Sequence, residues 1–288
     1  MIAAVACLLT ACNSEMKEEV TNEVTAPVTV RLNGFTMNQG EIPTTRATAV
    51  GDYDGVKTLI LAFYKTSDGT EVYKHAQVRN DNTTYTTFGE FTTNLPVDNY
   101  TLVVIGSGGN NTLTLTNATS ASYGENYVQD TFLYTQQVNI ANGSAVNLSA
   151  TLDRVVTALA LRSTDNRPAD VTNMRFTFSA GGKSFNPSTG LATSNTGFVH
   201  AMDFTSAVGA TSFSGSYLFL ATDTQNMDVT IETLDADGNV VFSKTITNVP
   251  LKRNRQTTLT GAIYSGASVS ANSFLINSTW ISGETINF

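Results

Sequence analysis

VTAPVTVRL, residues 24–32, shows the pattern from which the fold class follows. Its apolar residues occupy every second position, which is the period of a β-strand with one buried face. The expected buried face carries Val24, Ala26, Val28, Val30 and Leu32, and the other face carries Thr25, Pro27, Thr29 and Arg31. No window of the sequence shows the i, i+3, i+4, i+7 spacing of an amphipathic helix. We therefore expect an all-β protein with little or no helix.

Further along the chain, apolar runs alternate with turn signals. KTLILAFYK (57–65) and NYTLVVIGSG (99–108) have the length of buried strands. SDGT (67–70) and DADGN (235–239) have the composition of tight hairpin turns. Many short strands at this spacing are typical of β-sandwiches and barrels.

The second half of the chain repeats the order of features in the first half. LILAFYKTSDGTEVYKH (59–75) corresponds to MDVTIETLDADGNVVFSKTI (227–246), since each is a strand, an Asp-Gly turn and a strand. TNLPVDNYTLVVIGSG (93–108) likewise corresponds to TNVPLKRNRQTTLTGAIYSG (247–266). We expect two β-sandwich domains of related topology, at 47–153 and 154–288, joined without a Gly/Pro-rich linker.

Charge and cysteine content exclude several classes of function. Charged residues make up 14% of the chain, against roughly 25% in average soluble domains. The net charge of −8 argues against nucleic acid and anionic membranes as partners. Both cysteines, Cys7 and Cys12, lie at the N-terminus. The body of the protein therefore has no disulfide, no thiolate nucleophile and no Cys/His metal cluster.

The segments that resemble sites of chemistry are incomplete. GGKS (181–184) lacks the earlier glycine of a phosphate-binding loop. The acidic turn at 235–239 lacks the glutamate of a calcium loop, because Ile246 stands in its place. His75 and His200 have no nucleophile motif near them, and we expect both at the surface. We expect hairpins at these positions, no enzymatic activity and no cofactor or metal, although the sequence leaves a pair of carboxylates for glycoside hydrolysis open.

The pattern at the N-terminus predicts a targeting segment. MIAAVACLLTAC (1–12) is apolar and ends in small residues before Cys12, as in a bacterial lipoprotein signal. We expect Cys12 to be lipidated and to become the first mature residue. No Lys or Arg precedes the apolar run, which we attribute to a start codon assigned too far downstream. Residues 13–46 would then form a linker and an N-terminal strand. No other stretch approaches the roughly 20 apolar residues of a membrane helix, so we expect anchoring by lipid.

A single arginine stands out in EIPTTRATAVGDY, residues 41–53. Arg46 lies in a Thr/Ala-rich segment for which we expect no regular structure. A trypsin-like protease would recognise Arg46 as a cleavage site and cut between Arg46 and Ala47. The alternative is an incidental loop arginine.

Taken in order, these features resemble the fimbrillins of Bacteroidota, which are subunits and anchors of the type V pilus. The resemblance covers nearly the whole chain. It rests on the sequence before Cys12 and on LILAFYKTSDGTEVYKHAQV (59–78), FTTNLPVDNYTLVVIGS (91–107), LDRVVTALALRSTDNRPADV (152–171) and NVPLKRNRQTTLTGAIYS (248–265). Lys17-Glu18-Glu19 also resembles the signal that sends lipoproteins of these bacteria to the outer face of the outer membrane.

The resemblance implies a structural subunit and a route of assembly. Family members look like two tandem transthyretin-like β-sandwiches without an active site. The precursor reaches the outer-membrane surface as a lipoprotein, and an arginine-specific surface protease cuts it in an early loop. The N-terminal strand then leaves, and a strand of another fimbrial subunit, identical or different, takes its place. The resulting fimbrium supports adhesion to host or bacterial surface ligands.

Two segments are candidates for this exchange of strands. Loss of residues 24–32 would withdraw Val24, Val28, Val30 and Leu32 from the core and leave unpaired backbone edges. The C-terminal segment SFLINSTWISGETINF (273–288) is the candidate donor. Its apolar residues of one parity are Phe274, Ile276, Trp280, Ile286 and Phe288. The alternative is that this tail pairs within its own C-terminal half.

Two other functions fit the same sequence. The first is an uncleaved anchor or accessory subunit that keeps the lipid on Cys12 and residues 24–32 in place. The second is a surface glycan-binding lipoprotein or a β-sandwich hydrolase. Exposed aromatic side chains on one face, or two carboxylates about 5–10 Å apart in a cleft, would favour the second.

Overall fold

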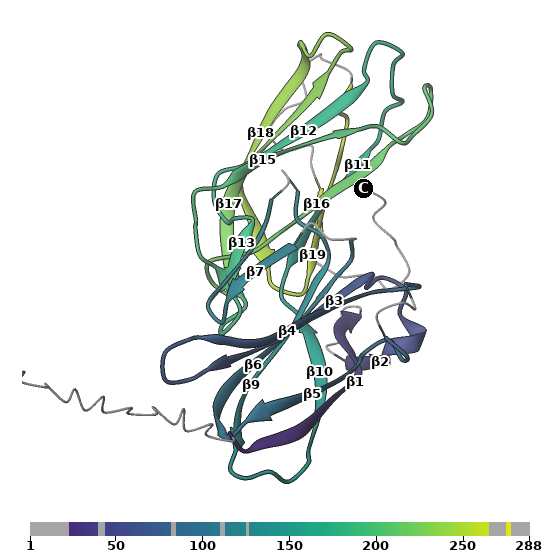
Figure 1. The fold of residues 1–288 in the computed structure, drawn as a ribbon. Helices are drawn as coiled ribbons and strands as arrows, with labels where there is room; N and C mark the ends of the chain where they lie inside the picture. Colours follow the sequence, from purple (N-terminus) through teal and green to yellow (C-terminus); the bar gives the residue numbers. More distant parts are fainter. Residues whose placement is uncertain are drawn as a thin grey trace, which may run out of the picture.

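The protein is built from β-strands (Figure 1). A computed structural model describes residues 23–39, 44–81, 85–109, 113–124, 127–264 and 275–277, and of residues 37–39, 44–47 and 275–277 it describes the backbone only. Within these ranges there is no α-helix, and one 3₁₀ turn, η1, spans Val50–Asp52. The expectation of an all-β fold is confirmed.

Ten strands are described up to Arg154, and we refer to this part of the chain as the first half. They are β1 (Thr25–Gln39), β2 (Thr44–Ala49), β3 (Thr58–Lys65), β4 (Glu71–Val78), β5 (Glu90–Pro96), β6 (Asp98–Ser107), β7 (Leu113–Asn117), β8 (Ser120–Tyr123), β9 (Thr131–Ile140) and β10 (Val146–Arg154).

Ten more strands are described in the second half. They are β11 (Thr157–Ser163), β12 (Asn173–Phe178), β13 (Ser184–Asn186), β14 (Leu191–Ala192), β15 (Phe198–Asp203), β16 (Phe213–Leu218), β17 (Thr224–Leu234), β18 (Val240–Lys252), β19 (Gln256–Gly261) and β20 (Leu275–Asn277).

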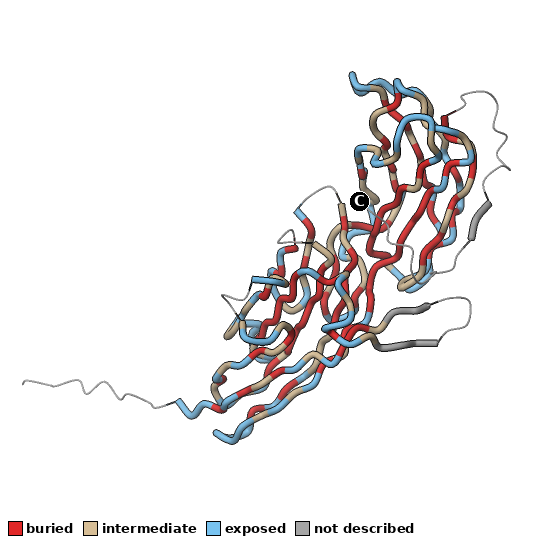
Figure 2. Tube along the Cα trace, turned by 90° about the vertical axis from the view of Figure 1, so that its right-hand side faces the viewer, coloured by how far each residue is buried: buried red, intermediate tan, exposed pale blue. Residues whose placement is uncertain are grey.

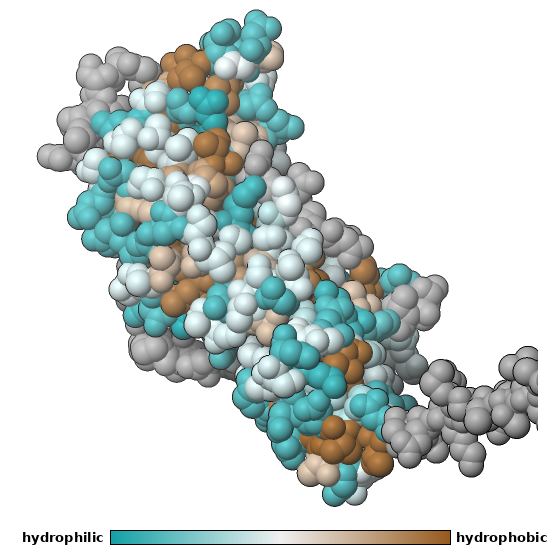
Figure 3. Space-filling view, turned by 60° about the vertical axis from the view of Figure 1, so that its left-hand side comes forward, coloured by the Kyte–Doolittle hydropathy of each residue, from teal (hydrophilic) through white to brown (hydrophobic). Residues whose placement is uncertain are grey.

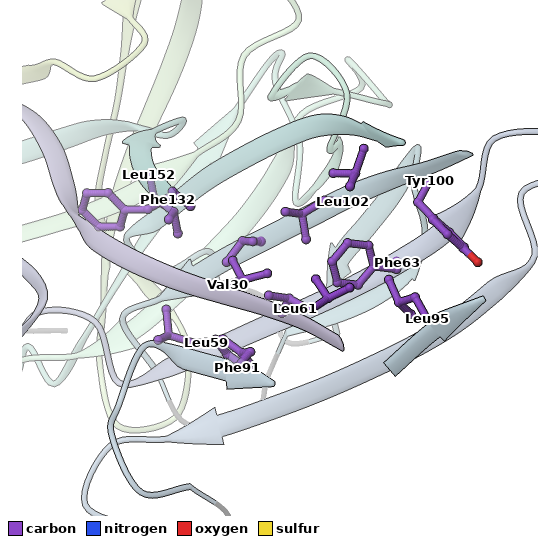
Figure 4. Close-up of a cluster of buried hydrophobic side chains, with 14 of the residues drawn as sticks. Val30, Leu59, Leu61, Phe63, Phe91, Leu95, Tyr100, Leu102, Phe132 and Leu152 are labelled. Carbon is purple, nitrogen blue, oxygen red and sulfur yellow. The ribbon is translucent and has the colours of Figure 1, made fainter. Parts of the chain in front are cut away.

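Eight of the ten first-half strands, all except β7 and β8, form one sheet that folds over into two layers. Its order is β2-β1-β10-β9-β6-β3-β4, with β5 also paired to β1. The only pairs between β9 and β10 are Asp153 with Leu133 and Arg154 with Phe132, so the sheet turns back on itself there. One layer holds β1, β2, β5 and β10, and the other holds β3, β4, β6 and β9. Apolar side chains of both layers meet between them (Figure 4).

The second half packs two four-stranded sheets face to face. One has the order β16-β11-β19-β20 and the other β15-β12-β17-β18. Leu159 and Leu161 of β11 face Phe176 of β12 and Ile231 of β17 in a shared core. The turns at 67–70 and 235–239 join β3 to β4 and β17 to β18, as the sequence predicts. Gly69 and Gly238 adopt positive φ values of 76° and 82° in these turns, which a residue without Cβ tolerates best.

A third core joins the two halves. Ile60, Ala62 and Tyr64 of β3 pack with Ala158 and Ala160 of β11. Strands β3 and β11 therefore bury both faces, and the buried segments of Figure 2 continue from one half into the other. A small sheet of order β14-β13-β8-β7 also contains strands of both halves. The join between β10 and β11 is short, and no Gly/Pro-rich linker separates the halves.

The surface is mostly polar. On the face that Figure 3 presents, hydrophilic groups surround smaller hydrophobic patches. Within the described ranges, the large apolar side chains that are exposed are all valines, namely Val24, Val97, Val199, Val208, Val240 and Val241.

Candidate functional site

Strand β1 has strand neighbours on both sides over its middle part. Residues 25–31 are paired with β5 on one side, and residues 34–39 are paired with β2 on that same side. On the other side, residues 28–36 pair in parallel with β10. Val30 thus lies between Phe91 of β5 and Leu148 of β10. The candidate strand for exchange, β1, is therefore a central strand. Its loss would leave the edges of β5 and β10 unpaired.

The inward-facing side chains of β1 are buried. The side chain of Val24, just before the strand, is not. Ala26, Val28 and Val30 are at most 1% exposed, and their side chains pack against those of the opposite layer. Leu32 is only partly buried. Val24 is 59% exposed, so the expectation that it belongs to the buried face is wrong. It precedes the first residue that pairs with β5, and the layer no longer covers it.

The strand continues beyond Leu32 through an irregularity that the sequence does not reveal. The register against β10 shifts between Leu32 and Gly34, so that Phe35 points into the core and is fully buried. Its ring centroid lies 5.7 Å from that of Tyr53 and 5.1 Å from that of Phe132. A Cβ at position 34 would lie 2.3 Å from the backbone oxygen of Thr48, so glycine is needed for the close approach of β2.

Arg46 does not lie in an irregular loop, and that expectation is also wrong. It is part of β2, where it is opposite Met37 of β1, and Ala47 is opposite Thr36. The sequence TTRATA has no apolar alternation. It forms a strand because the extension of β1 offers it an edge of backbone donors and acceptors. Strand β2 ends the order of its sheet, and its backbone is already extended, as protease substrates are when they bind.

The position of Arg46 relative to β1 has a simple consequence. Strand β1 ends at Gln39, so a chain break after Arg46 would disconnect the entire strand from the body. Burying Val28, Val30 and Phe35 contributes roughly 5–9 kcal/mol as an upper estimate. A free β1 would therefore leave slowly unless another segment could replace these contacts.

The candidate donor at the C-terminus is described over one short strand. Ile276 lies in β20, where it is paired with Leu259 of β19 in its own half. The described residues of the tail, 275–277, thus pair within the C-terminal half, which is the alternative to a role as donor strand. Phe274, Trp280, Ile286, Phe288 and Cys12 lie outside the described residues.

A buried ion pair lies next to the end of β1, at the join between the halves. Arg154 donates from Nε to Oδ1 of Asp130 at 2.7 Å and from Nη2 to Oδ2 at 2.6 Å. The Tyr53 hydroxyl donates to the same carboxylate at 2.9 Å. Burial and the neighbouring Asp130 carboxylate raise the pKa of Tyr53, so the phenol stays protonated. Because Phe35 packs on Tyr53 and Phe132, the far end of β1 covers this pair.

The acidic turn at 235–239, considered above as a calcium loop, has a structural role. In the turn at 235–239, Asp235 Oδ1 accepts from the N–H groups of Asp237 and Asn239, which closes a hairpin. The described residues include no group of three or more His, Cys, Asp or Glu side chains that could hold a metal. Among the same residues no helix has the length and apolar character needed to cross a membrane.

His200 is not a surface residue, contrary to the expectation from sequence. It is 4% exposed, its Nδ1 lies 2.9 Å from Ser216 Oγ, and its ring stacks on that of Tyr127. It is on the inward face of β15, where the hydroxyl of Ser216 replaces water as a hydrogen-bond partner. Burial lowers the pKa of His200 to about 4, so it is neutral at pH 7.

Comparison with known families gives one match. The model of a family described as being of unknown function, DUF6562, matches residues 18–270. Among curated proteins no sequence match is found.

Solved structures share the fold at low sequence identity. A candidate adhesin from Bacteroides ovatus is 12% identical, with a TM-score of 0.53 over 90% of this chain and 95% of the other. A second candidate adhesin from that species is 11% identical, with a TM-score of 0.50 over 84% and 88%. The fimbrial anchor protein Mfa2 from Porphyromonas gingivalis is 11% identical, with a TM-score of 0.48 over 91% and 99%. The first two likenesses establish a shared fold.

Proposed function

This chain belongs to the DUF6562 family, and we propose that it is a structural subunit of a surface fimbrium that joins other subunits by exchange of strand β1. Proteolysis between Arg46 and Ala47 releases the strand. An extended segment of a neighbouring fimbrial subunit then occupies the space between β5 and β10.

The position of β1 is the observation that carries this proposal. It is an inner strand with three β-strand neighbours, yet a single break after Arg46 separates it from the body. Its removal exposes the edges of β5 and β10 together with the apolar side chains that Ala26, Val28 and Val30 had covered. Unpaired edges and an open core are satisfied together when a strand is added.

The comparisons support a role in adhesion without enzymatic activity. Proteins of this fold include two described as candidate adhesins. The exposed large apolar side chains in the described ranges are valines and not aromatic residues, which does not favour a glycan-binding platform. The proposed route runs from lipidation at Cys12, through the outer-membrane surface, to a fimbrium built from copies of this subunit or of related ones.

A reversible lock on β1 tests the proposal. Thr29 of β1 and Thr92 of β5 are paired on the outer face of their layer. In the double variant Thr29→Cys with Thr92→Cys, a disulfide would hold β1 in place after proteolysis. We expect SDS-resistant polymers to be absent under oxidising conditions and to return when the disulfide is reduced.

A matched lock in the second half provides the control. Thr230 of β17 and Thr245 of β18 are also paired, and their hydroxyl groups lie 2.8 Å apart. The double cysteine variant at these positions should polymerise whether oxidised or reduced. Polymers that form with β1 locked would contradict strand exchange. Surface protein that keeps its lipid and its β1 would instead indicate an uncleaved anchor or accessory subunit.

A further inference from the structure

Loss of β1 raises the question of what holds β5. Among the described strands, β5 has backbone pairs with β1 alone. It follows β4 in the chain and precedes β6, but both of those strands belong to the opposite layer. If backbone pairing were its only support, β5 would lose its place together with β1, and no defined edge would remain for an incoming strand.

The N-terminal end of β5 is held by a buried side chain of the opposite layer. Gln77 of β4 is 1% exposed. Its Nε2 donates to the backbone oxygen of Glu90 at 2.7 Å, and its Oε1 accepts from the backbone N–H of Gly89 at 2.8 Å. One amide side chain thus satisfies one backbone donor and one backbone acceptor at this end of β5. Gly89 has a φ of 90°, a backbone conformation that glycine adopts readily.

The other end of β5 is held in a similar way. Tyr100 of β6 is fully buried, and its hydroxyl donates to the backbone oxygen of Pro96 at 2.8 Å. The Tyr100 ring packs edge-on against Phe63 of β3, with 6.2 Å between centroids. Between the two ends, Phe91 and Leu95 point into the core (Figure 4). All of these contacts are made without β1.

We infer that Gln77 and Tyr100 are positioning residues that keep β5 in place as a preformed docking edge for an incoming strand. The role of Gln77 and Tyr100 in assembly rests on the proposed function. Their role in keeping β5 in place does not. The partner that fits is an extended segment antiparallel to β5 and parallel to β10. Its inward positions must be apolar, with a small residue opposite Leu95 and medium-sized ones opposite Thr93 and Phe91, as Ala26, Val28 and Val30 are now.

Capture of a labelled strand tests the inference on the full-length chain. Residues 40–43, between β1 and β2, are replaced by the recognition sequence of a site-specific protease, so that the folded protein can be nicked. A fluorescent peptide of residues 23–39 is then added in excess, and its incorporation is followed by anisotropy. The first test variant is Gln77→Met, which keeps the side-chain volume and removes both hydrogen bonds. The second is Tyr100→Phe, which removes only the hydroxyl.

Two matched variants remove buried hydrogen bonds away from β5. Tyr123 is buried, and its hydroxyl lies 2.7 Å from Thr131 Oγ1, so Tyr123→Phe matches Tyr100→Phe. Gln256 of β19 is 3% exposed and donates to Thr258, so Gln256→Met matches Gln77→Met. We expect capture to be at least about tenfold slower in each test variant, and within about twofold of the unsubstituted rate in each control.

Amide exchange in the uncut protein separates the two claims. The Gly89 N–H bonds to Gln77 and not to β1, so its protection should fall at least about tenfold in Gln77→Met and stay unchanged in Gln256→Met. Equal capture rates in test and control variants would overturn the inference and leave the proposed function standing. If the unsubstituted nicked protein captures no peptide, the proposed function fails. Gly89 protection that survives in Gln77→Met would then overturn the hold on β5 as well.

Discussion

Val30 in β1 is paired with Leu148 in β10, and the two strands run in the same direction. A parallel pair cannot be closed by a hairpin, so the chain passes through most of the first half before it reaches β10. The neighbours β5 and β10 that β1 needs are thus remote in sequence. A strand from another molecule could meet the same two neighbours without any change in how the chain is connected.

Truncation within β1 should cost stability only where the side chain is buried. Val30→Ala removes two methyl groups from a position that is 1% exposed. We expect the free energy of unfolding to fall by about 2 kcal/mol, from lost burial and from the cavity that remains. Urea denaturation followed by circular dichroism measures this difference.

The control lies at the residue just before the strand. Val24 is 59% exposed, so Val24→Ala should change the free energy of unfolding by no more than about 0.5 kcal/mol. Equal losses in the two variants would mean that β1 does not seal the core at Val30.

The Asp130–Arg154 pair should behave as a unit. Arg154→Met would leave the Asp130 carboxylate buried without its two charged hydrogen bonds, at a cost of about 3–5 kcal/mol. Adding Asp130→Leu removes the stranded charge. We expect the double variant to be more stable than Arg154→Met alone, as measured by denaturant unfolding. Costs that simply add would show that the two groups do not depend on each other.

His200 should make stability depend on pH in a window above the range where carboxylates titrate. Its pKa is lowered to about 4 by burial, against about 6.5 when unfolded. Between these pH values the His200 side chain binds more protons in the unfolded chain than in the folded one. The contribution of His200 to the free energy of unfolding is therefore fully present above pH 6.5 and declines as the pH falls towards 4. The total loss is on the order of 3 kcal/mol.

The variant His200→Gln isolates this contribution. Asp68 and Asp98 also have lowered pKa values, because the backbone N–H groups of Thr70 and Asn99 donate to them. Their contribution is lost as the pH falls below the unfolded aspartate value, which is beneath the histidine window. Unfolding free energies measured from pH 7.5 to 4.5 should be flatter in His200→Gln than in the unsubstituted protein. Parallel curves would show that His200 is not held neutral.

The sequence predicts the strands well where a local pattern determines them. Alternation places Val28 and Val30 on the buried face of β1, and the Asp-Gly turns mark two hairpins. The apolar run of β3 has the length of a buried strand, and in the fold two cores use its two sides.

Features that depend on distant partners could not be predicted. The burial of Phe35 follows from a register shift against β10, which only the paired strands can reveal. Strand β2 around Arg46 exists because β1 extends beyond Leu32, and no pattern within TTRATA indicates it. Likewise, nothing near His200 in the sequence points to Ser216, although the two residues meet in the folded protein.

The N-terminus of the protein at the cell surface shows whether β1 is released by proteolysis and replaced. We would measure intact mass and N-terminal sequence for the unsubstituted protein and for Arg46→Ala, with Arg31→Ala as a control, since Arg31 is an exposed arginine in β1. We expect a chain that begins at Ala47 within SDS-resistant ladders, and the loss of both in Arg46→Ala alone. A lipidated Cys12 with β1 still covalently attached, in polymers or out of them, would show that β1 is not exchanged.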